Sequence, residues 1–124
     1  AYLPNITVIR GKPAKTFVRM MDDSEKGATK ENHDANLKQA ISHIQNDQCD
    51  LLILDEALDA YQLSLLDDKL FKELVLHKPD ALELVITGHK PVDWVMEKAD
   101  YLTEMVKKKH PYNSGVPARK GIEF

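Results

Sequence analysis

The sequence predicts an α/β domain built on a parallel sheet with helices on both faces. Short apolar runs of strand length alternate along the chain with longer segments of helical periodicity, which is typical of parallel sheets. The run "LLIL" (51–54) is apolar throughout, as expected of a strand covered on both faces. The 124 residues are 43% hydrophobic, which is enough for one core, so we expect residues 1–124 to form a single domain.

The first half of the chain predicts two strands with a helix between them. The segment "NITVIR" (5–10) is rich in β-branched residues and is expected to be a strand. Polar residues of N-cap type at 22–24 begin a helix, in which apolar residues then recur at helical spacing: Leu37, Ala40, Ile41 and Ile44. "LLIL" is the second strand.

The second half continues the alternation. "LDDKLFKELVLHKP" (66–79) begins with capping acids and ends before Pro79, so it predicts a helix. "LELVIT" (82–87) predicts a strand, and "PVDWVMEKA" (91–99) a short helix with Pro91 in its first turn and Trp94 in the core or at an interface. "YLTEMV" (101–106) predicts the last strand, and the tail is expected to be a loop.

Charge and composition exclude several classes of protein. Acids outnumber bases, 20 to 17, which argues against binding nucleic acid by bulk attraction. No apolar run reaches the roughly 18 residues of a membrane span, and the N-terminus does not resemble a signal peptide, so we expect a cytoplasmic protein with no membrane partner. Cys49 is the only cysteine, which leaves no internal disulfide and indicates no redox role.

Polar residues follow two of the predicted strands directly. Asp55 and Glu56 come after the second strand, and Thr87, Gly88 and His89 stand at the end of the third. Ligands bind at the carboxyl ends of parallel strands, where one acid can hold Mg²⁺ through water and a second can complete the metal shell. The alternative is that the two acids cap a following helix and stay solvated. The pattern alone leaves both interpretations open.

A nucleotide site would also need a phosphate-binding loop of the form GxxxxGK[ST]. The segment "GKPAKT" (11–16) has a similar outline, but it lacks the second glycine, and Pro13 has no N–H to offer a phosphate. We therefore do not interpret it as such a loop. The five histidines have no metal-ligand spacing, and no Ser-His-Asp or Cys-His arrangement is recognisable.

Three segments in order, "LLILDEALDAY", "LVITGHKP" and "ADYLTEMVKKKHPYNSGVPARKGIEF", resemble the P-loop type ATP:cob(I)alamin (corrinoid) adenosyltransferases. The resemblance is strong over residues 49–124 and loose over 1–48. It implies a P-loop NTPase (RecA-like) fold and a transferase that moves the 5′-deoxyadenosyl group of ATP to the cobalt of a reduced corrinoid. The reaction would serve cobalamin biosynthesis or salvage, with Mg-ATP as co-substrate and the corrinoid as substrate.

The resemblance also implies roles for individual residues. Asp55 and Glu56 would be catalytic and would lie at the magnesium and the phosphates. His89 stands where the family usually has Arg, which removes a forked, permanently charged phosphate donor. The residues expected to contact the nucleotide or corrinoid are Thr87, Gly88, His89, Lys109, His110 and Phe17.

One family segment is missing from the sequence. In the family a strand, the phosphate loop, its helix and a further strand precede the region that matches residue 1, so we expect this chain alone to be inactive. Loss of a central strand would leave unpaired sheet edges, and we expect pairing with another chain, as in a homodimer, to cover them. The alternative is a non-catalytic short relative that binds corrinoid or nucleotide or serves as an interaction module. A generic flavodoxin-like or receiver-like domain would not explain the ordered C-terminal motifs.

Overall fold

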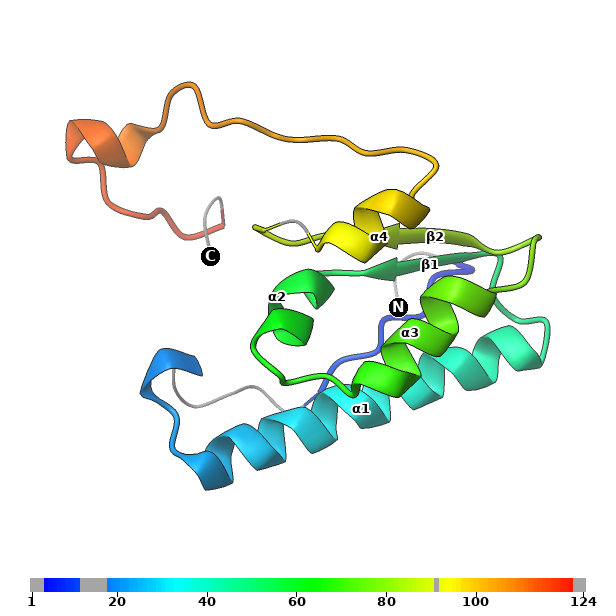
Figure 1. Ribbon diagram of the computed structural model, residues 1–124. Coiled ribbons are helices and arrows are strands. Elements are labelled where there is room, and N and C mark those ends of the chain that lie inside the picture. The colour runs from blue at the N-terminus through cyan, green and yellow to red at the C-terminus, as the bar shows by residue number, and fades with distance from the viewer. Residues whose placement is uncertain (1–3, 12–17, 91, 122–124) are drawn as a thin grey trace.

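The computed structural model describes residues 4–11, 18–90 and 92–121. Strands β1 (Leu51–Leu54) and β2 (Glu83–Ile86) pair in parallel, with Leu51 opposite Glu83 and Leu54 opposite Ile86 (Figure 1). The predicted α/β class with a parallel sheet is therefore confirmed. The helical elements are η1 (Val18–Met20), α1 (Asp23–Gln45), α2 (Ala57–Gln62), α3 (Asp68–His77), α4 (Asp93–Lys98) and η2 (Pro111–Ser114).

Helix α1 begins where the sequence predicts because a capping box fixes its first turn. The Asp22 side chain accepts a hydrogen bond from the Glu25 N–H (2.8 Å), and the Glu25 side chain accepts one from the Asp22 N–H (3.1 Å). The first turns of the helix are exposed, whereas Leu37, Ala40 and Ile44 are buried. The helix therefore packs through its C-terminal half, as the spacing of apolar residues indicates.

Helix α3 is also confirmed. The Asp67 carboxylate accepts a hydrogen bond from the Leu70 N–H (2.8 Å), and Phe71, Leu74 and Val75 are buried. The helix ends at His77, two residues before Pro79.

Helix α4 carries the predicted aromatic anchor. The ring centroid of Trp94 lies 5.9 Å from that of Tyr61 and 5.9 Å from that of Phe71, both in edge-on geometry. Trp94 is therefore a core residue, as expected. Pro91, which was expected in the first turn of this helix, lies outside the described residues.

Polar contacts tie α1 to the loop that precedes α3. The Asp34 carboxylate accepts a hydrogen bond from the Asp67 N–H (2.7 Å) and forms an ion pair with Lys30, which raises the pKa of the Lys30 ammonium. His33 Nδ1–H donates to the Leu65 carbonyl (2.9 Å). These contacts fix the start of α3 against the middle of α1.

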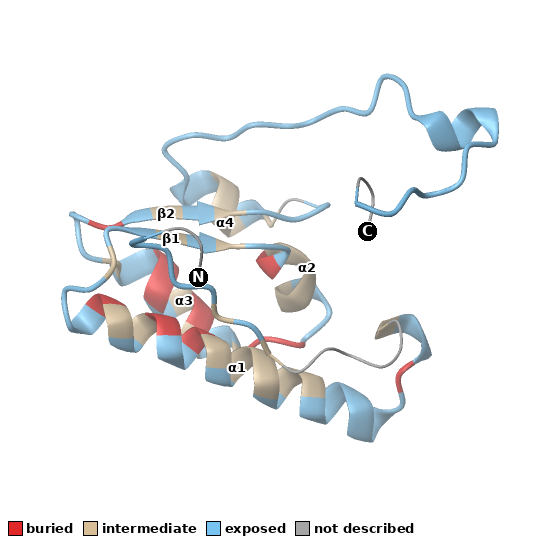
Figure 2. Ribbon diagram, turned by 180° about the vertical axis from the view of Figure 1, so that it is seen from behind, coloured by how far each residue is buried: buried red, intermediate tan, exposed pale blue. Residues whose placement is uncertain are grey.

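The core lies on one face of the sheet (Figure 2). Side chains from the two strands alternate: those of Leu52, Leu54, Leu84 and Ile86 pack against the buried residues of the helices, whereas Leu51, Ile53 and Val85 are 54%, 58% and 44% exposed. The buried cluster consists of Leu37, Ile44, Ala57, Leu66, Phe71, Leu74, Val75 and Leu82.

The prediction of helices on both faces is therefore wrong for the described part of the chain. A right-handed crossover between two neighbouring parallel strands places all of its connecting helices on one side. Here α2 and α3 form that crossover, and α1 and α4 pack against the same cluster. An apolar strand sequence permits burial on the second face, but it does not supply an element to cover it.

Two predicted strands, 5–10 and 101–106, are also wrong. Neither segment pairs with β1 or β2, and the sheet has two strands within the described residues. Most of their apolar side chains are exposed, for example Val8 by 62% and Met105 by 94%, whereas Ile9 is half-buried. Sequence pattern gives a segment strand propensity, but a strand also needs a neighbour for its backbone hydrogen bonds. Figure 1 shows the C-terminal segment (99–121) running away from the α/β body.

Two further features of the sequence are the lack of a membrane-spanning run and the single cysteine. Among the described helices, none combines the length and the hydrophobicity that crossing a bilayer requires. Cys49 is free and half-buried, and its thiol donates to the Leu51 carbonyl (3.4 Å).

Candidate functional site

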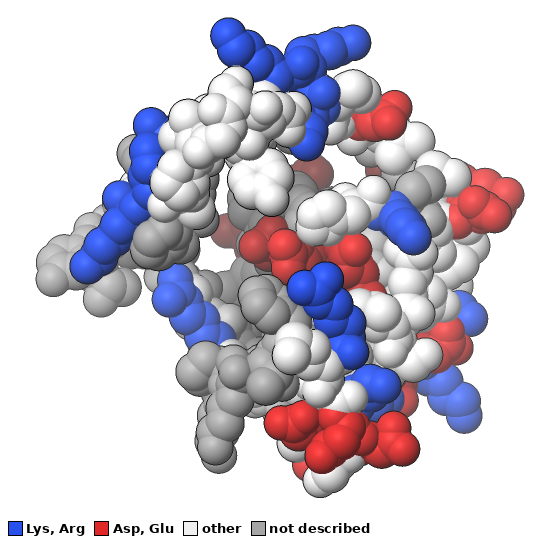
Figure 3. Space-filling view, turned by 90° about the vertical axis from the view of Figure 1, so that its left-hand side faces the viewer, with Lys and Arg blue, Asp and Glu red and all other residues white. Residues whose placement is uncertain are grey.

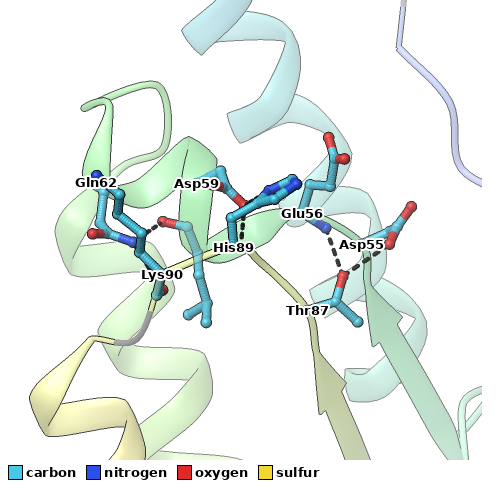
Figure 4. A network of polar contacts seen from close by, with 8 residues as sticks. Asp55, Glu56, Asp59, Gln62, Thr87, His89 and Lys90 are labelled. Carbon is cyan, nitrogen blue, oxygen red and sulfur yellow. Dashed lines mark hydrogen bonds and ion pairs between the residues drawn. The ribbon is translucent and has the colours of Figure 1, made fainter. Parts of the chain in front are cut away.

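The carboxyl ends of β1 and β2 carry the candidate site. The Thr87 N–H donates to the Leu54 carbonyl (3.0 Å), which extends the pairing of the strands by one step. The Thr87 hydroxyl then donates to Asp55 Oδ1 (2.8 Å) and accepts a hydrogen bond from the Glu56 N–H (2.9 Å) (Figure 4). One hydroxyl thus contacts the Asp55 carboxylate and the Glu56 backbone, and these residues lie at the same edge of the sheet, as expected from their positions after neighbouring strands.

Glu56 has a left-handed backbone, with φ 53° and ψ 22°. This conformation costs a non-glycine residue on the order of 1–2 kcal/mol, and the hydrogen bond from its N–H to Thr87 helps to hold it in place. The turn at Glu56 leads directly into α2, whose Leu58 N–H donates to the Thr87 carbonyl (3.2 Å).

The alternative interpretation, that the two acids cap a following helix, is correct for the position of Glu56 but not for its side chain. A helix does follow them, and Glu56 occupies its N-cap position, but its side chain makes no capping hydrogen bond. Asp55 binds Thr87 instead. Both acids are exposed, and in Figure 4 their carboxylates point away from the sheet. They are therefore accessible to a ligand.

Gly88 allows the loop after β2 to pack directly on α2. A Cβ atom at this position would lie 2.5 Å from Leu58 Cβ and 3.0 Å from Asp59 Oδ2, closer than real Cβ contacts. Any side chain would therefore push the loop and the helix apart. The structure gives this glycine a packing reason, in addition to the nucleotide contact that the resemblance implies.

His89 is held by Asp59 through two contacts. Asp59 Oδ2 lies 2.9 Å from the His89 backbone nitrogen and 3.2 Å from its ring Nδ1. Partial burial opposes ionisation of Asp59, but the hydrogen bonds from His89 outweigh it and lower the pKa of the carboxyl. The contact therefore stabilises the folded protein at pH values above the pKa of Asp in the unfolded chain. This stabilisation is lost as the pH falls through the lower pKa that Asp59 has in the folded protein.

Helix α2 and its side chains Asp59 and Gln62 were not anticipated. Gln62 Nε2 donates to the Lys90 carbonyl (3.1 Å), so the helix is tied to the loop after β2 at both of its ends. The sequence does hold a signal for this helix, since Ala57, Ala60 and Tyr61 recur at i, i+3 and i+4. All three are buried or half-buried.

The face toward which both strands point is charged. Figure 3 looks onto this side and shows acidic side chains gathered near its middle, with Lys and Arg side chains around them. The described residues contain no group of three or more His, Cys, Asp or Glu able to hold a metal ion by themselves. Asp55 and Glu56 fit the partial shell of a Mg²⁺ ion that takes its remaining ligands from phosphates and water.

The other predicted site residues are not brought to this edge. Lys109 and His110 are exposed in the C-terminal segment, where His110 Nδ1 accepts a hydrogen bond from the Tyr112 N–H (3.1 Å). Phe17 lies outside the described residues. The structure thus brings together Asp55, Glu56, Thr87, Gly88 and His89 of the predicted set.

Comparison with known proteins covers nearly the whole chain. The family described as ATP:corrinoid adenosyltransferase BtuR/CobO/CobP matches residues 2–124. A corrinoid adenosyltransferase of Sinorhizobium sp is 33% identical over 82 residues, which cover 65% of this chain and 38% of the relative. One of Pseudomonas aeruginosa is 33% identical over 75 residues, 60% of this chain and 36% of the relative. The chain thus spans just over a third of the length of these relatives. No solved structure matches it.

Proposed function

Because the chain belongs to the ATP:corrinoid adenosyltransferase family, we propose that it takes part in transferring the 5′-deoxyadenosyl group of ATP to a reduced corrinoid such as cob(I)alamin. In this reaction the cobalt(I) electron pair forms a bond to C5′ of the ribose. The C5′–O bond breaks at the same time, and its electron pair leaves with triphosphate. The reactants balance without a further oxidant or reductant once the corrinoid is in the cobalt(I) state.

The observation that carries this proposal is that the Thr87 hydroxyl, at the ends of the two strands, binds the Asp55 carboxylate and the Glu56 backbone N–H, while both carboxylates remain exposed. Asp55 and Glu56 would hold the Mg²⁺ that accompanies the triphosphate, and this ion would supply charge neutralisation for the leaving group. Thr87 holds the Asp55 carboxylate in place before the ligand binds, so less side-chain entropy is lost on binding.

A complete triphosphate site needs donors beyond these residues. In the P-loop (RecA-like) fold that we propose for the whole protein, the backbone N–H groups of a GxxxxGK[ST] loop supply them. The sequence contains no such loop, and the chain spans just over a third of the curated relatives. We therefore propose that these 124 residues alone do not turn over substrate. A second chain, such as the other protomer of a homodimer, would pair with the unpaired strand edges.

The test is to measure Mg²⁺-dependent adenosylation of cob(I)alamin with the protein as its gene encodes it, in the wild type and in Asp55→Asn and Glu56→Gln. We expect each substitution to lower kcat by about 100-fold or more, by analogy with the loss of one preorganised group at the reacting charge. Glu83→Gln is the matched control, since Glu83 is an exposed acid at the opposite, amino end of β2, and the activity of this variant should be unchanged. Wild-type turnover in both site variants would refute the assignment.

A second candidate is a binding module without turnover, because the exposed carboxylates of Asp55 and Glu56 could bind a ligand without a reaction following. This alternative predicts a corrinoid absorbance change on titration with the 124-residue chain, while the protein as its gene encodes it shows no adenosylation. Turnover by the wild-type protein would exclude it.

A further inference from the structure

We propose that Asp59 is a positioning residue that aims the ring of His89 at the triphosphate of the bound nucleotide. The inference rests on the proposed function, because it names the group that this site offers to the phosphates besides Mg²⁺. The proposal depends on three features: the double contact between Asp59 and His89, the exposure of the ring, and the anchoring of the loop that carries it.

The double contact fixes both the backbone and the side chain of His89. A single carboxylate oxygen, Asp59 Oδ2, accepts from the His89 backbone N–H (2.9 Å) and from ring Nδ1 (3.2 Å). A carboxylate is only an acceptor, so Nδ1 carries a hydrogen and the ring is held by that edge. The second ring nitrogen, Nε2, lies on the opposite edge of the imidazole and therefore faces away from Asp59.

The free edge of the ring is open to a ligand. The His89 side chain is 77% exposed, whereas that of Asp59 is 29% exposed. The positioning group is thus set back in the protein, and the group that it positions stands at the surface. This is the usual arrangement of a carboxylate behind a ligand-binding histidine, in which the carboxylate sets the orientation of the ring.

The loop that carries His89 is anchored at the acidic site. Thr87, two residues earlier, binds Asp55 and Glu56, and two residues of chain span at most about 7 Å. Gly88 packs against Leu58 without room for a side chain, so the loop has little freedom between these points. An anion held by Mg²⁺ at the two acids would therefore lie close to the ring of His89.

Charge explains why such a donor is needed. The charged groups near His89 are the carboxylates of Asp59 on α2, of Glu56 at the N-cap position of α2 and of Asp55 after β1, with Lys90 next in the chain (Figure 4). Three carboxylates repel a triphosphate, and one Mg²⁺ offsets only part of that charge. In its imidazolium form, the only form in which both ring nitrogens carry hydrogens, His89 donates from Nδ1 to Asp59 and from Nε2 to a phosphate oxygen, and so adds a charge-assisted hydrogen bond.

The experiment measures the affinity of the protein as its gene encodes it for inorganic triphosphate with Mg²⁺, by calorimetry. We expect His89→Gln to weaken binding about 10-fold and Asp59→Asn to weaken it several-fold. In the double variant the loss should equal that of His89→Gln alone, since Asp59 acts through the ring. His89→Arg should restore most of the affinity, because it returns a cationic donor.

A merely structural role for Asp59 gives a different pattern. Asp59→Asn would then lower the midpoint of thermal unfolding. It would also weaken triphosphate binding by the same factor in the wild type and in His89→Gln. Such additive losses of affinity in the double variant would overturn the proposal. His89→Gln keeps the backbone N–H that binds Asp59, so it tests the ring even if Asp59→Asn does not fold. Unchanged affinity in His89→Gln would also overturn the proposal.

Failure of this inference can be told apart from failure of the proposed function. Adenosylation by the wild type together with unchanged triphosphate affinity in His89→Gln would overturn the role of the ring and leave the reaction standing. The expected affinity pattern without any adenosylation would support the phosphate contact and contradict the reaction.

Discussion

Both faces of the small sheet carry apolar side chains, but the faces have opposite environments, and only the exposed face also carries an acid, Glu83. On one face Leu52, Leu54, Leu84 and Ile86 pack against the core, and on the other Leu51, Ile53 and Val85 are exposed by 44% to 58%. Hydrophobicity alone does not separate the two sets. The difference comes from the placement of the helices, because α2 and α3 connect β1 to β2 on one side of the sheet, and α1 and α4 pack against the same cluster.

The largest loss of stability is expected for substitution of Phe71, which lies in the core on the covered side of the sheet. This side chain is 0% exposed and stacks against Tyr61 at 5.0 Å between ring centroids. We expect Phe71→Ala to lower the free energy of unfolding by about 3–5 kcal/mol, measured by urea denaturation, because it leaves a cavity under the helices. Tyr112→Ala, at an aromatic residue 75% exposed in the C-terminal segment, is the control and should change stability by less than about 0.5 kcal/mol. A cost below about 1 kcal/mol at Phe71 would mean that the covered face is not closely packed.

An intermediate effect is expected where α1 is fastened to the loop before α3. Asp34→Ala removes the acceptor of the Asp67 N–H, and a partly buried donor left without a partner costs about 1–2 kcal/mol. Lys30→Ala removes only the half-buried cation that pairs with Asp34 and Asp67 and should cost less than Asp34→Ala in the same denaturation experiment. Equal losses in the two variants would show that the ion pair, rather than the backbone hydrogen bond, holds α1 in place.

Substitutions on the exposed face of the sheet should change the free energy of unfolding least. Ile53→Thr keeps a β-branched residue in β1 and removes apolar surface from the exposed side, so we expect a change below about 0.5 kcal/mol in unfolding free energy. The solubility limit of the protein should rise at the same time, because less apolar surface is open to self-association. A loss above about 2 kcal/mol would indicate that another element or chain covers this face in solution.

The sequence predicts those elements whose causes are local. The N-cap residues of helices α1 and α3 are Asp22 and Asp67, whose side chains cap the first turns, and both helices carry regular apolar spacing. Segments 5–10 and 101–106 carry strand propensity of the same kind, yet they are not strands because no described neighbour pairs with them. A strand requires a partner that is distant in sequence, and local pattern does not contain that information.

The candidate site divides in the same way. The rule that parallel strands end at one edge of a sheet was enough to place Asp55 and Thr87 at the same edge, and the structure adds a hydrogen bond between them that the sequence did not predict. Asp59 was missed because its contact with His89 depends on α2, a helix of six residues that is too short to be stable by itself. That helix is held by the loop after β2, so its existence depends on tertiary contacts.

The parallel register of β1 and β2 links the hydrophobic core to the chemistry at its edge. Leu54 lies opposite Ile86, and the next residues, Asp55 and Thr87, form the polar contact. A slip of one residue would turn the apolar side chains of the slipped strand to the opposite face and would move Thr87 out of line with Asp55. Misfolded molecules with a shifted strand would therefore lose the site together with the core. The ligand that we propose for Asp55 and Glu56 would accordingly bind only molecules in which β1 and β2 pair in the native register. Its binding would therefore measure the fraction of refolded protein that is correctly folded.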